Sequence, residues 1–306
     1  MAIAAVFPGQ GSQKVGMLQE VSENYPIIKE TYTEASEALG FDLWSLVQEG
    51  PSEELTNTQN TQPALLAASV GLWRVWQDKK NVLADYMAGH SLGEYSALVC
   101  AGVLEFKDAI LLVRKRGELM NAAVPKGEGV MAAVMGLEDQ QVAECCDQVD
   151  GEVSAANYNA PGQVVIAGEN EAVDRAIEVA KELGAKRAIK LDVSGPFHSR
   201  LMLSASDKFA DYIHKIEFYT PRIPVIQNVN ADISSDVEKI KSNLIKQLSA
   251  PVLWTATMNK LIELGIGRIV ECGPGAVLRG LGKRVSRDLS FDGLENVADM
   301  EAFLSN

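Results

Sequence analysis

The sequence predicts an α/β fold with a mainly parallel sheet and a small domain inserted into the larger one. Strand-like and helix-like segments alternate along most of the chain, which is the order of a parallel sheet covered by helices. From about residue 127 the order changes to strand, helix, strand, strand, helix, strand, which is typical of a ferredoxin-like domain. The segment 89–93 adds a serine between two glycines at a strand-to-helix turn.

The elements of the large domain lie on both sides of the insert. Before it we expect a buried first strand over 1–7, a strand over 86–88, and helices over 27–39, 61–77, 94–101 and 107–123. Asn60 is the expected N-cap of the second helix, with Pro63 in its first turn. After the insert we expect helices over 199–216, 237–248 and 254–264, strands over 223–228 and 268–272, and a last helix opened by the turn 273–275.

The insert itself has four expected strands and two helices. The strands are expected over 130–135, 153–158, 164–167 and 187–191, and the helices over 139–147 and 171–183. An Asn-Ala-Pro-Gly turn at 159–162 joins the two middle strands. The expected domains are therefore a ferredoxin-like subdomain over 124–194 and a large domain over 1–123 and 195–306.

Composition and charge narrow the class of protein. The chain has 306 residues, of which 47% are hydrophobic and 23% charged, as in an ordinary globular core. Its apolar start has no preceding basic residues, so we expect no signal peptide, and no stretch is long enough to span a bilayer. A net charge of −13 disfavours general attraction to nucleic acid or to an anionic membrane. We expect a cytoplasmic protein whose acidic partners, if it has any, bind a local basic patch.

The four cysteines do not indicate a metal or redox site. They show neither C-x-x-C spacing nor the density of a secreted disulfide scaffold. We therefore expect reduced, buried thiols and no metal. The residues concerned are Cys100, Cys145, Cys146 and Cys272.

The pentapeptide Gly89-His90-Ser91-Leu92-Gly93 has the form of a nucleophile elbow. A serine held exposed on a tight turn can act as a nucleophile, and glycines permit the turn because they carry no Cβ. Ser91 is therefore the candidate for covalent acyl transfer. An ordinary serine in such a turn is the alternative, because five-residue matches also occur by chance.

A serine nucleophile needs a base, and the chain has three histidines. His90 adjoins the serine and is interpreted as a packed or capping residue, and His214 lies on the charged face of an amphipathic helix. His198 follows a Gly-Pro turn just after the insert, where α/β folds present catalytic loops. We take His198 as the candidate base. No carboxylate partner is evident from spacing: Asp192 is near in sequence but lies on a strand, and a dyad oriented by a backbone carbonyl stays open.

Six motifs in order resemble those of the malonyl-CoA:acyl carrier protein transacylases, and the resemblance covers essentially the whole chain. This family resemblance implies an α/β-hydrolase-like large domain, a ferredoxin-like small domain and a site in the cleft between them. It also implies a Ser91–His198 dyad with an oxyanion hole formed by the backbone N–H groups of Gln10 and Leu92. The motifs are FPGQGSQ at 7–13, GHSLGEYSA at 89–97, RKRG at 114–117, NYNAPGQ at 157–163, FHS at 197–199 and ECGPG at 271–275.

The resemblance also assigns substrate-binding residues and partners. Arg116 matches the arginine that holds the malonyl carboxylate, and a backbone carbonyl near Gln247 is the implied orienter of the imidazole. Malonyl-CoA and acyl carrier protein are the implied partners, with no separate cofactor and a monomeric enzyme. The stretch before the histidine, 195–197, varies in the family, so the wall that it forms is less defined than His198 itself.

Three alternatives remain. A serine esterase or thioesterase, or an acyltransferase for another acyl-CoA, would use the same nucleophile. A nucleotide-binding protein is suggested by the glycine turn 273–275 after a strand, but Leu278 stands where a third glycine is needed. A non-catalytic binding module would have no use for Ser91, His198 and Arg116 together.

An acidic carrier protein would be repelled by this acidic chain unless a basic surface receives it. Two basic stretches are candidates. Lys186 and Arg187 precede Lys190 on the last strand of the insert, and Lys283 and Arg284 lie within 279–287. The alternative is that both stretches are solvated faces without a partner.

Overall fold

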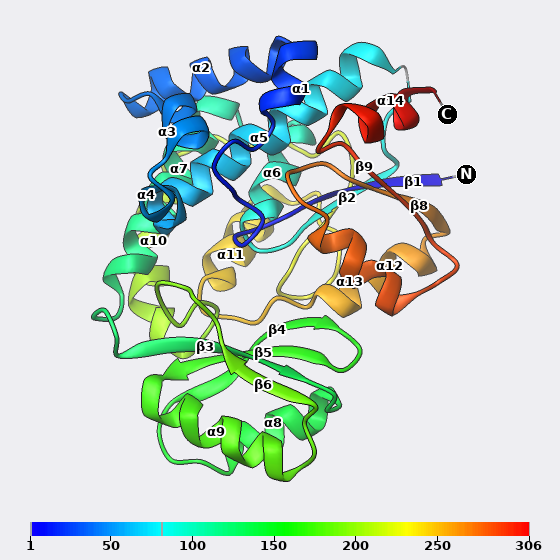
Figure 1. Ribbon diagram of the computed structural model, residues 1–306. Coiled ribbons are helices and arrows are strands. Elements are labelled where there is room, and N and C mark those ends of the chain that lie inside the picture. Colours follow the sequence, from blue (N-terminus) through cyan, green and yellow to red (C-terminus); the bar gives the residue numbers. More distant parts are fainter. Residues whose placement is uncertain (1, 81, 306) are drawn as a thin grey trace.

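The computed structural model describes residues 2–80 and 82–305, and it divides them between two sheets (Figure 1). Every pairing in the larger sheet is parallel, and the smaller sheet is antiparallel throughout. The predicted α/β fold class is therefore confirmed. In the order β7-β2-β1-β8-β9, the larger sheet contains β7 (Val225–Ile226), β2 (Tyr86–Gly89), β1 (Ala2–Phe7), β8 (Ile266–Glu271) and β9 (Ser290–Gly293).

The first strand lies at the centre of this sheet and is covered on both faces. Ala5 and Phe7 belong to the main hydrophobic core, whereas Ala4 and Val6 belong to a second core on the opposite face. The sequence of such a strand is a continuous run of apolar residues, because both of its faces are buried. Met1, which the expected strand included, lies outside the described residues. The main core is covered by α2 (Ile27–Leu39), α5 (Thr58–Lys79), α6 (Leu92–Cys100) and α7 (Phe106–Ala122), and the second by α12 (Trp254–Glu263) and α13 (Val277–Val285).

The small sheet has the ferredoxin-like strand order β4-β5-β3-β6. Its two helices lie on the face away from the large domain (Figure 1), where Ala132 and Val134 join them in a separate core. Met131 and Ala133, which alternate with these residues, belong to the main core of the large domain. The small sheet is therefore packed on the large domain. Its elements are β3 (Gly129–Met135), α8 (Asp139–Asp147), β4 (Val153–Ala160), β5 (Gln163–Glu169), α9 (Asn170–Glu182) and β6 (Arg187–Lys190).

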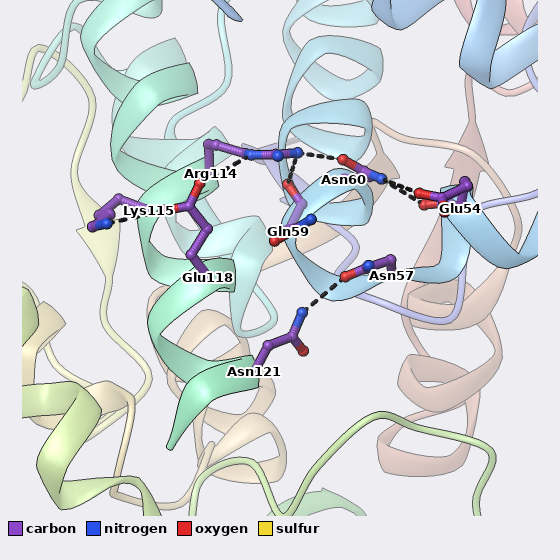
Figure 2. Close-up of polar contacts among 8 residues, drawn as sticks. All are labelled: Glu54, Asn57, Gln59, Asn60, Arg114, Lys115, Glu118 and Asn121. Atoms are coloured by element: carbon purple, nitrogen blue, oxygen red, sulfur yellow. Dashed lines mark hydrogen bonds and ion pairs between the residues drawn. The ribbon is translucent and has the colours of Figure 1, made fainter. Parts of the chain in front are cut away.

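Helix α5 begins one turn earlier than the sequence suggests, at Thr58, so the expected N-cap role of Asn60 is wrong. Pro63 therefore lies beyond the first turn, where it can donate no hydrogen bond to the carbonyl of Gln59. Arg114 of α7 supplies the missing donor, from Nη1 to the Gln59 carbonyl at 3.3 Å (Figure 2). The Asn60 amide instead donates to the carbonyl of Glu54 at 2.8 Å. A side chain from a neighbouring helix thus allows the proline inside α5.

Two expected elements after the insert are shorter than predicted. The strand expected over 223–228 has only the two residues of β7, because the chain then turns to bond with α6 instead of the sheet. The helix expected over 199–216 starts as a 3₁₀ turn at Arg200–Met202 and continues as α10. The elements not expected are α1 (Gln19–Asn24), α3 (Leu43–Glu49), α4 (Ser52–Thr56), β9 and α14 (Val297–Ser305), while α10 is Leu203–Ile213 and α11 is Val237–Gln247.

The segment 191–197 between β6 and His198, which we call the strap, is connected to the large domain by a series of hydroxyl and amide groups. The Ser194 hydroxyl donates to Asn121 Oδ1 at 3.1 Å, so its oxygen accepts from the Thr58 hydroxyl at 2.7 Å. Thr58 in turn accepts from Gln10 Nε2 at 3.1 Å. The strap, the start of α5 and the turn after β1 are therefore held together.

Within residues 2–80 and 82–305, no helix has the length and apolarity needed to cross a membrane. The same residues contain no cluster of three or more His, Cys, Asp or Glu side chains suited to a metal ion. All four cysteines are free thiols. Burial raises the pKa of the Cys272 thiol, which keeps it protonated.

Gly117 is where α7 crosses α5, and it offers a test of this packing. A Cβ there would lie 2.6 Å from the Gln59 Cα and 2.8 Å from the Thr58 carbonyl oxygen, both backbone atoms. Gly117→Ala should therefore lower the free energy of unfolding by about 1–3 kcal/mol, as overpacking does. Gly280→Ala is the control, because a Cβ at this helical position meets nothing within 4 Å and should stabilise. Urea unfolding checks both, and equal effects would contradict the close crossing.

Candidate active site

The elbow is built by backbone contacts that admit no side chain at either glycine. A Cβ on Gly89 would lie 1.9 Å from the backbone of Gly93, and a Cβ on Gly93 would lie 2.0 Å from the Phe7 carbonyl oxygen. Between them Ser91 has φ 52° and ψ −109°, a conformation that L-residues rarely adopt. The turn therefore holds Ser91 at the start of α6, directly after β2.

Ser91 and His198 form a hydrogen-bonded pair. The Ser91 Oγ lies 2.7 Å from His198 Nε2, and His198 Nδ1 lies 2.7 Å from the backbone carbonyl oxygen of Gln247. A carbonyl can only accept, so Nδ1 carries the proton and Nε2 is free to accept from the serine hydroxyl. Burial, together with the charge of Arg116, lowers the pKa of His198 to about 3. The imidazole is therefore neutral near pH 7, as a general base must be.

Arg116 on α7 is fully buried beside the pair. One of its nitrogens, Nη2, lies 3.2 Å from Ser91 Oγ and 3.0 Å from Gln247 Oε1, while Nη1 donates to Gln62 Oε1 at 2.8 Å. These partners are neutral oxygens, and Nε meets no acceptor of good geometry among the described residues. Burial lowers the pKa of Arg116, but an arginine stays charged at any pH near neutrality. The site therefore presents a buried cation next to the serine.

The two expected oxyanion donors lie on the turns that flank the serine. Leu92 is the first residue of α6, so its N–H has no acceptor within the helix. Gln10 follows β1, and the turns after β1 and β2 touch because the His90 N–H donates to the Phe7 carbonyl at 2.9 Å. This contact places the turn that carries Gln10 beside the turn that carries Ser91, and the oxyanion role of the two N–H groups stays a prediction.

Several buried polar residues of the site were not found from the sequence. Glu94 is 1% exposed and accepts from Gln247 Nε2 at 2.7 Å, Asn228 N at 3.0 Å and Gln227 Nε2 at 3.2 Å. Burial raises the pKa of Glu94 to about 7. The signal available was Glu94 itself, a carboxylate within the otherwise apolar first turns of a helix. Its partners come from remote segments and give no local pattern.

The other two histidines lie where the sequence suggests. His90 Nε2 lies 2.8 Å from Asn159 Oδ1 on β4, and its ring is 5.6 Å from that of Trp254. It therefore joins the elbow to the small sheet. His214 is exposed at the end of α10.

The four expected docking residues are exposed and lie toward one end of the small sheet. Arg187 of β6 pairs with Met135 of β3, which pairs with Gln163 of β5, and the Gln163 side chain accepts from Arg284 of α13. This row of contacts connects the two basic stretches. Their remaining basic residues are partly engaged: Lys190 is paired with Asp174, and Arg279 with Glu271, Glu295 and Asp299.

Comparison with known proteins gives a consistent result along the chain. The model of the acyl transferase domain family matches residues 5–301. A malonyl CoA-acyl carrier protein transacylase of Salmonella typhimurium is 52% identical over 304 residues, covering 99% of this chain and 98% of that protein. The protein of the same name from Bacillus subtilis is 49% identical over 290 residues, covering 94% of this chain and 91% of that protein.

Solved structures agree with these sequence matches. A malonyl-transacylase in complex with a type II PKS acyl-carrier protein superposes with a TM-score of 0.99 at 51% identity, covering 100% of both chains. An acyl carrier protein S-malonyltransferase from Vibrio cholerae gives a TM-score of 0.97 at 52% identity, covering 99% of this chain and 100% of that one. On these matches, which extend over almost its whole length, this chain belongs to the acyl transferase family.

Proposed function

We propose that this acyltransferase moves a malonyl group from malonyl-CoA to the phosphopantetheine thiol of an acyl carrier protein, as a step of fatty acid synthesis. The observation that carries the proposal is the buried Arg116 guanidinium, 3.2 Å from the Ser91 hydroxyl. An acyl group on that serine would meet a cation, and malonyl has a free carboxylate to pair with it. The names of the similar proteins support the same activity.

Acylation would begin with proton transfer from Ser91 to His198 Nε2 as the serine oxygen attacks the thioester carbonyl. The Gln247 carbonyl holds the imidazole in the required tautomer. The N–H groups of Gln10 and Leu92 would receive the developing oxyanion, and each such donor contributes about a hundredfold or more in rate. Coenzyme A would leave as a thiol after taking the proton from His198.

Transfer would run through the same groups in reverse. His198 would deprotonate the phosphopantetheine thiol, which attacks the malonyl-serine ester and frees the Ser91 hydroxyl. One site thus serves two substrates in turn, so the kinetics would be ping-pong. Every step uses side chains and backbone groups of this chain, so we propose that the enzyme needs no cofactor and no metal.

The partner surface and the cellular setting are part of the same proposal. The basic edge formed by Lys186, Arg187, Lys283 and Arg284 would hold an acidic carrier protein at the mouth of the cleft. We further propose a monomeric, cytoplasmic enzyme that binds neither nucleic acid nor membrane. Light scattering after size-exclusion chromatography would test the monomeric state, and cell fractionation would test the cytoplasmic location.

The first prediction from this proposal tests the function itself. Mixing the protein with malonyl-CoA should add one malonyl group to its intact mass, and Ser91→Ala should prevent the addition because it removes the attacking oxygen. The adduct should persist in buffer and discharge rapidly when a phosphopantetheine thiol is added. Rapid loss to water without a thiol would favour a thioesterase, and an adduct on Ser91→Ala would disprove the nucleophile.

The second prediction concerns acyl selectivity. Arg116→Ala should reduce acylation by malonyl-CoA about tenfold to a hundredfold relative to acetyl-CoA, because only malonyl loses a charge-assisted hydrogen bond. Acylation rates from rapid-quench mass measurements with both thioesters give the ratio. Lys115→Ala is the matched control, since this neighbouring side chain bonds to Glu118 at the surface. Equal losses for malonyl and acetyl would remove Arg116 from substrate recognition.

The third prediction concerns carrier docking. Reversing Lys283 and Arg284 to glutamate should raise the KM for the carrier protein and weaken its salt dependence, because steering depends on these exposed charges. Formation of malonyl-serine from malonyl-CoA should be unchanged. Glutamates at two exposed lysines, Lys208 on α10 and Lys215 just after its end, give the same change in net charge away from the basic edge. If both double variants affect the carrier step equally, docking lies elsewhere.

A further inference from the structure

The nucleophile is held in a strained backbone conformation: α6 bonds the Ser91 carbonyl, through the Glu94 N–H at 3.1 Å, but it offers no acceptor to the Ser91 N–H. Ser91 has φ 52° and occupies the N-cap position of α6, but its side chain caps no helical N–H. Its Oγ is engaged with His198 and Arg116 instead. A non-glycine residue persists in such a conformation only when its surroundings over-determine it. Another group must therefore fix the Ser91 backbone.

Asn228 contacts the elbow on both sides of His90, the residue that leads into the serine. Its Oδ1 accepts from the Ser91 N–H at 2.7 Å, and its Nδ2 donates to the Gly89 carbonyl at 2.7 Å. Both bonds are short for N–H···O contacts. One planar amide thus spans the peptide units before and after His90, and its two bonds are satisfied together only in this turn.

The backbone of Asn228 is itself held in place by α6 and by the sheet. It is fully buried two residues after β7, and its backbone N–H donates to Glu94 Oε2 at 3.0 Å. β7 pairs with β2, so the segment that carries Asn228 is anchored to the same strand that leads into the elbow. The Asn228 side chain, which we call the clamp, is held in place by the sheet and by α6. It therefore keeps its position if the turn around Ser91 relaxes.

We propose that Asn228 is a positioning residue that holds Ser91 in its strained conformation and so keeps Oγ within reach of both His198 and the thioester carbonyl. Asn228 acts through the backbone of Ser91 and does not touch the substrate. The inference rests on the proposed acyl transfer for its main assay. It concerns the placement of the nucleophile, which applies to any reaction of Ser91.

The test compares Asn228→Ala with Asn243→Ala. Asn243 is also a buried asparagine, and its Nδ2 donates to Gln227 Oε1 at 2.8 Å, but it does not contact the elbow. Asn228→Ala should lower the acylation rate about a hundredfold at unchanged KM for malonyl-CoA, the cost of a small misplacement of a reacting atom. Asn243→Ala should lose about as much thermal stability but less than about threefold in rate.

Asn228→Asp gives a second measurement, the pH dependence of activity relative to wild type, which a general loss of stability would not change. At low pH a protonated aspartic acid has one acceptor and one donor, as the amide does, whereas the carboxylate cannot donate to the Gly89 carbonyl. Burial raises the pKa of such a carboxyl group. Its activity relative to wild type should therefore rise as pH falls, and that of Asn228→Ala should stay flat. Asn228→Ala, measured over the same pH range, is the control for the titration of Glu94 and His198, which face the same region.

Labelling by a fluorophosphonate separates this proposal from the proposed function, because the probe reports Ser91 reactivity without any malonyl group. Slow labelling of Asn228→Ala and normal labelling of Asn243→Ala support the clamp even if wild type takes up no malonyl. Wild-type labelling and acylation rates in Asn228→Ala overturn it. Equal losses in both alanine variants, or an Asn228→Asp profile as flat as that of Asn228→Ala, overturn it as well.

Discussion

The buried carboxylate of Glu94 is the constraint on which the rest of the site depends. A carboxylate taken out of water costs several kcal/mol unless hydrogen-bond donors surround it. Here Gln247, Asn228 and Gln227 supply those donors, all within 3.2 Å. They belong to α11 and to the segment after β7, whereas Glu94 belongs to α6. These segments therefore cannot shift independently without leaving the buried carboxyl group of Glu94 without its hydrogen-bond partners.

Gln247 connects Glu94 to each reacting group through hydrogen bonds. Its backbone carbonyl orients His198 at 2.7 Å, its Oε1 holds Arg116 at 3.0 Å, and its Nε2 bonds the Ser91 carbonyl at 3.1 Å as well as Glu94. One residue at the last turn of α11 thus couples the base, the buried cation and the elbow. A change at any of these positions should be felt at the others, because groups that share one hydrogen-bond network are not energetically additive.

The sequence was sufficient wherever the cause of a structure is local. Helix α2 matches its expected bounds, since its apolar periodicity ends at Gly40, which has φ 75°. The elbow was recognisable because its residues form one short contiguous pattern, although only Gly89 is required by a local contact, with Gly93, whereas Gly93 is required by the Phe7 carbonyl at the end of β1. The start of α5 was missed because the carbonyl that Pro63 leaves free is satisfied by Arg114 from another helix. Asn228 was missed for the same reason: its partners lie more than 130 positions away.

The buried guanidinium of Arg116 links this network to the choice of acyl group. A planar guanidinium has five N–H donors, and here its hydrogen bonds go only to neutral oxygens, while Nε meets no acceptor of good geometry among the described residues. The oxygens of Glu94 are bonded by other donors, so Glu94 acts on Arg116 through its charge and not through a hydrogen bond. A substrate carboxylate would give the guanidinium of Arg116 an anionic hydrogen-bond partner, whereas a neutral acyl group would leave it without one. Because Gln247 fixes Arg116 and orients His198 at once, selectivity and nucleophile activation depend on the same buried contacts.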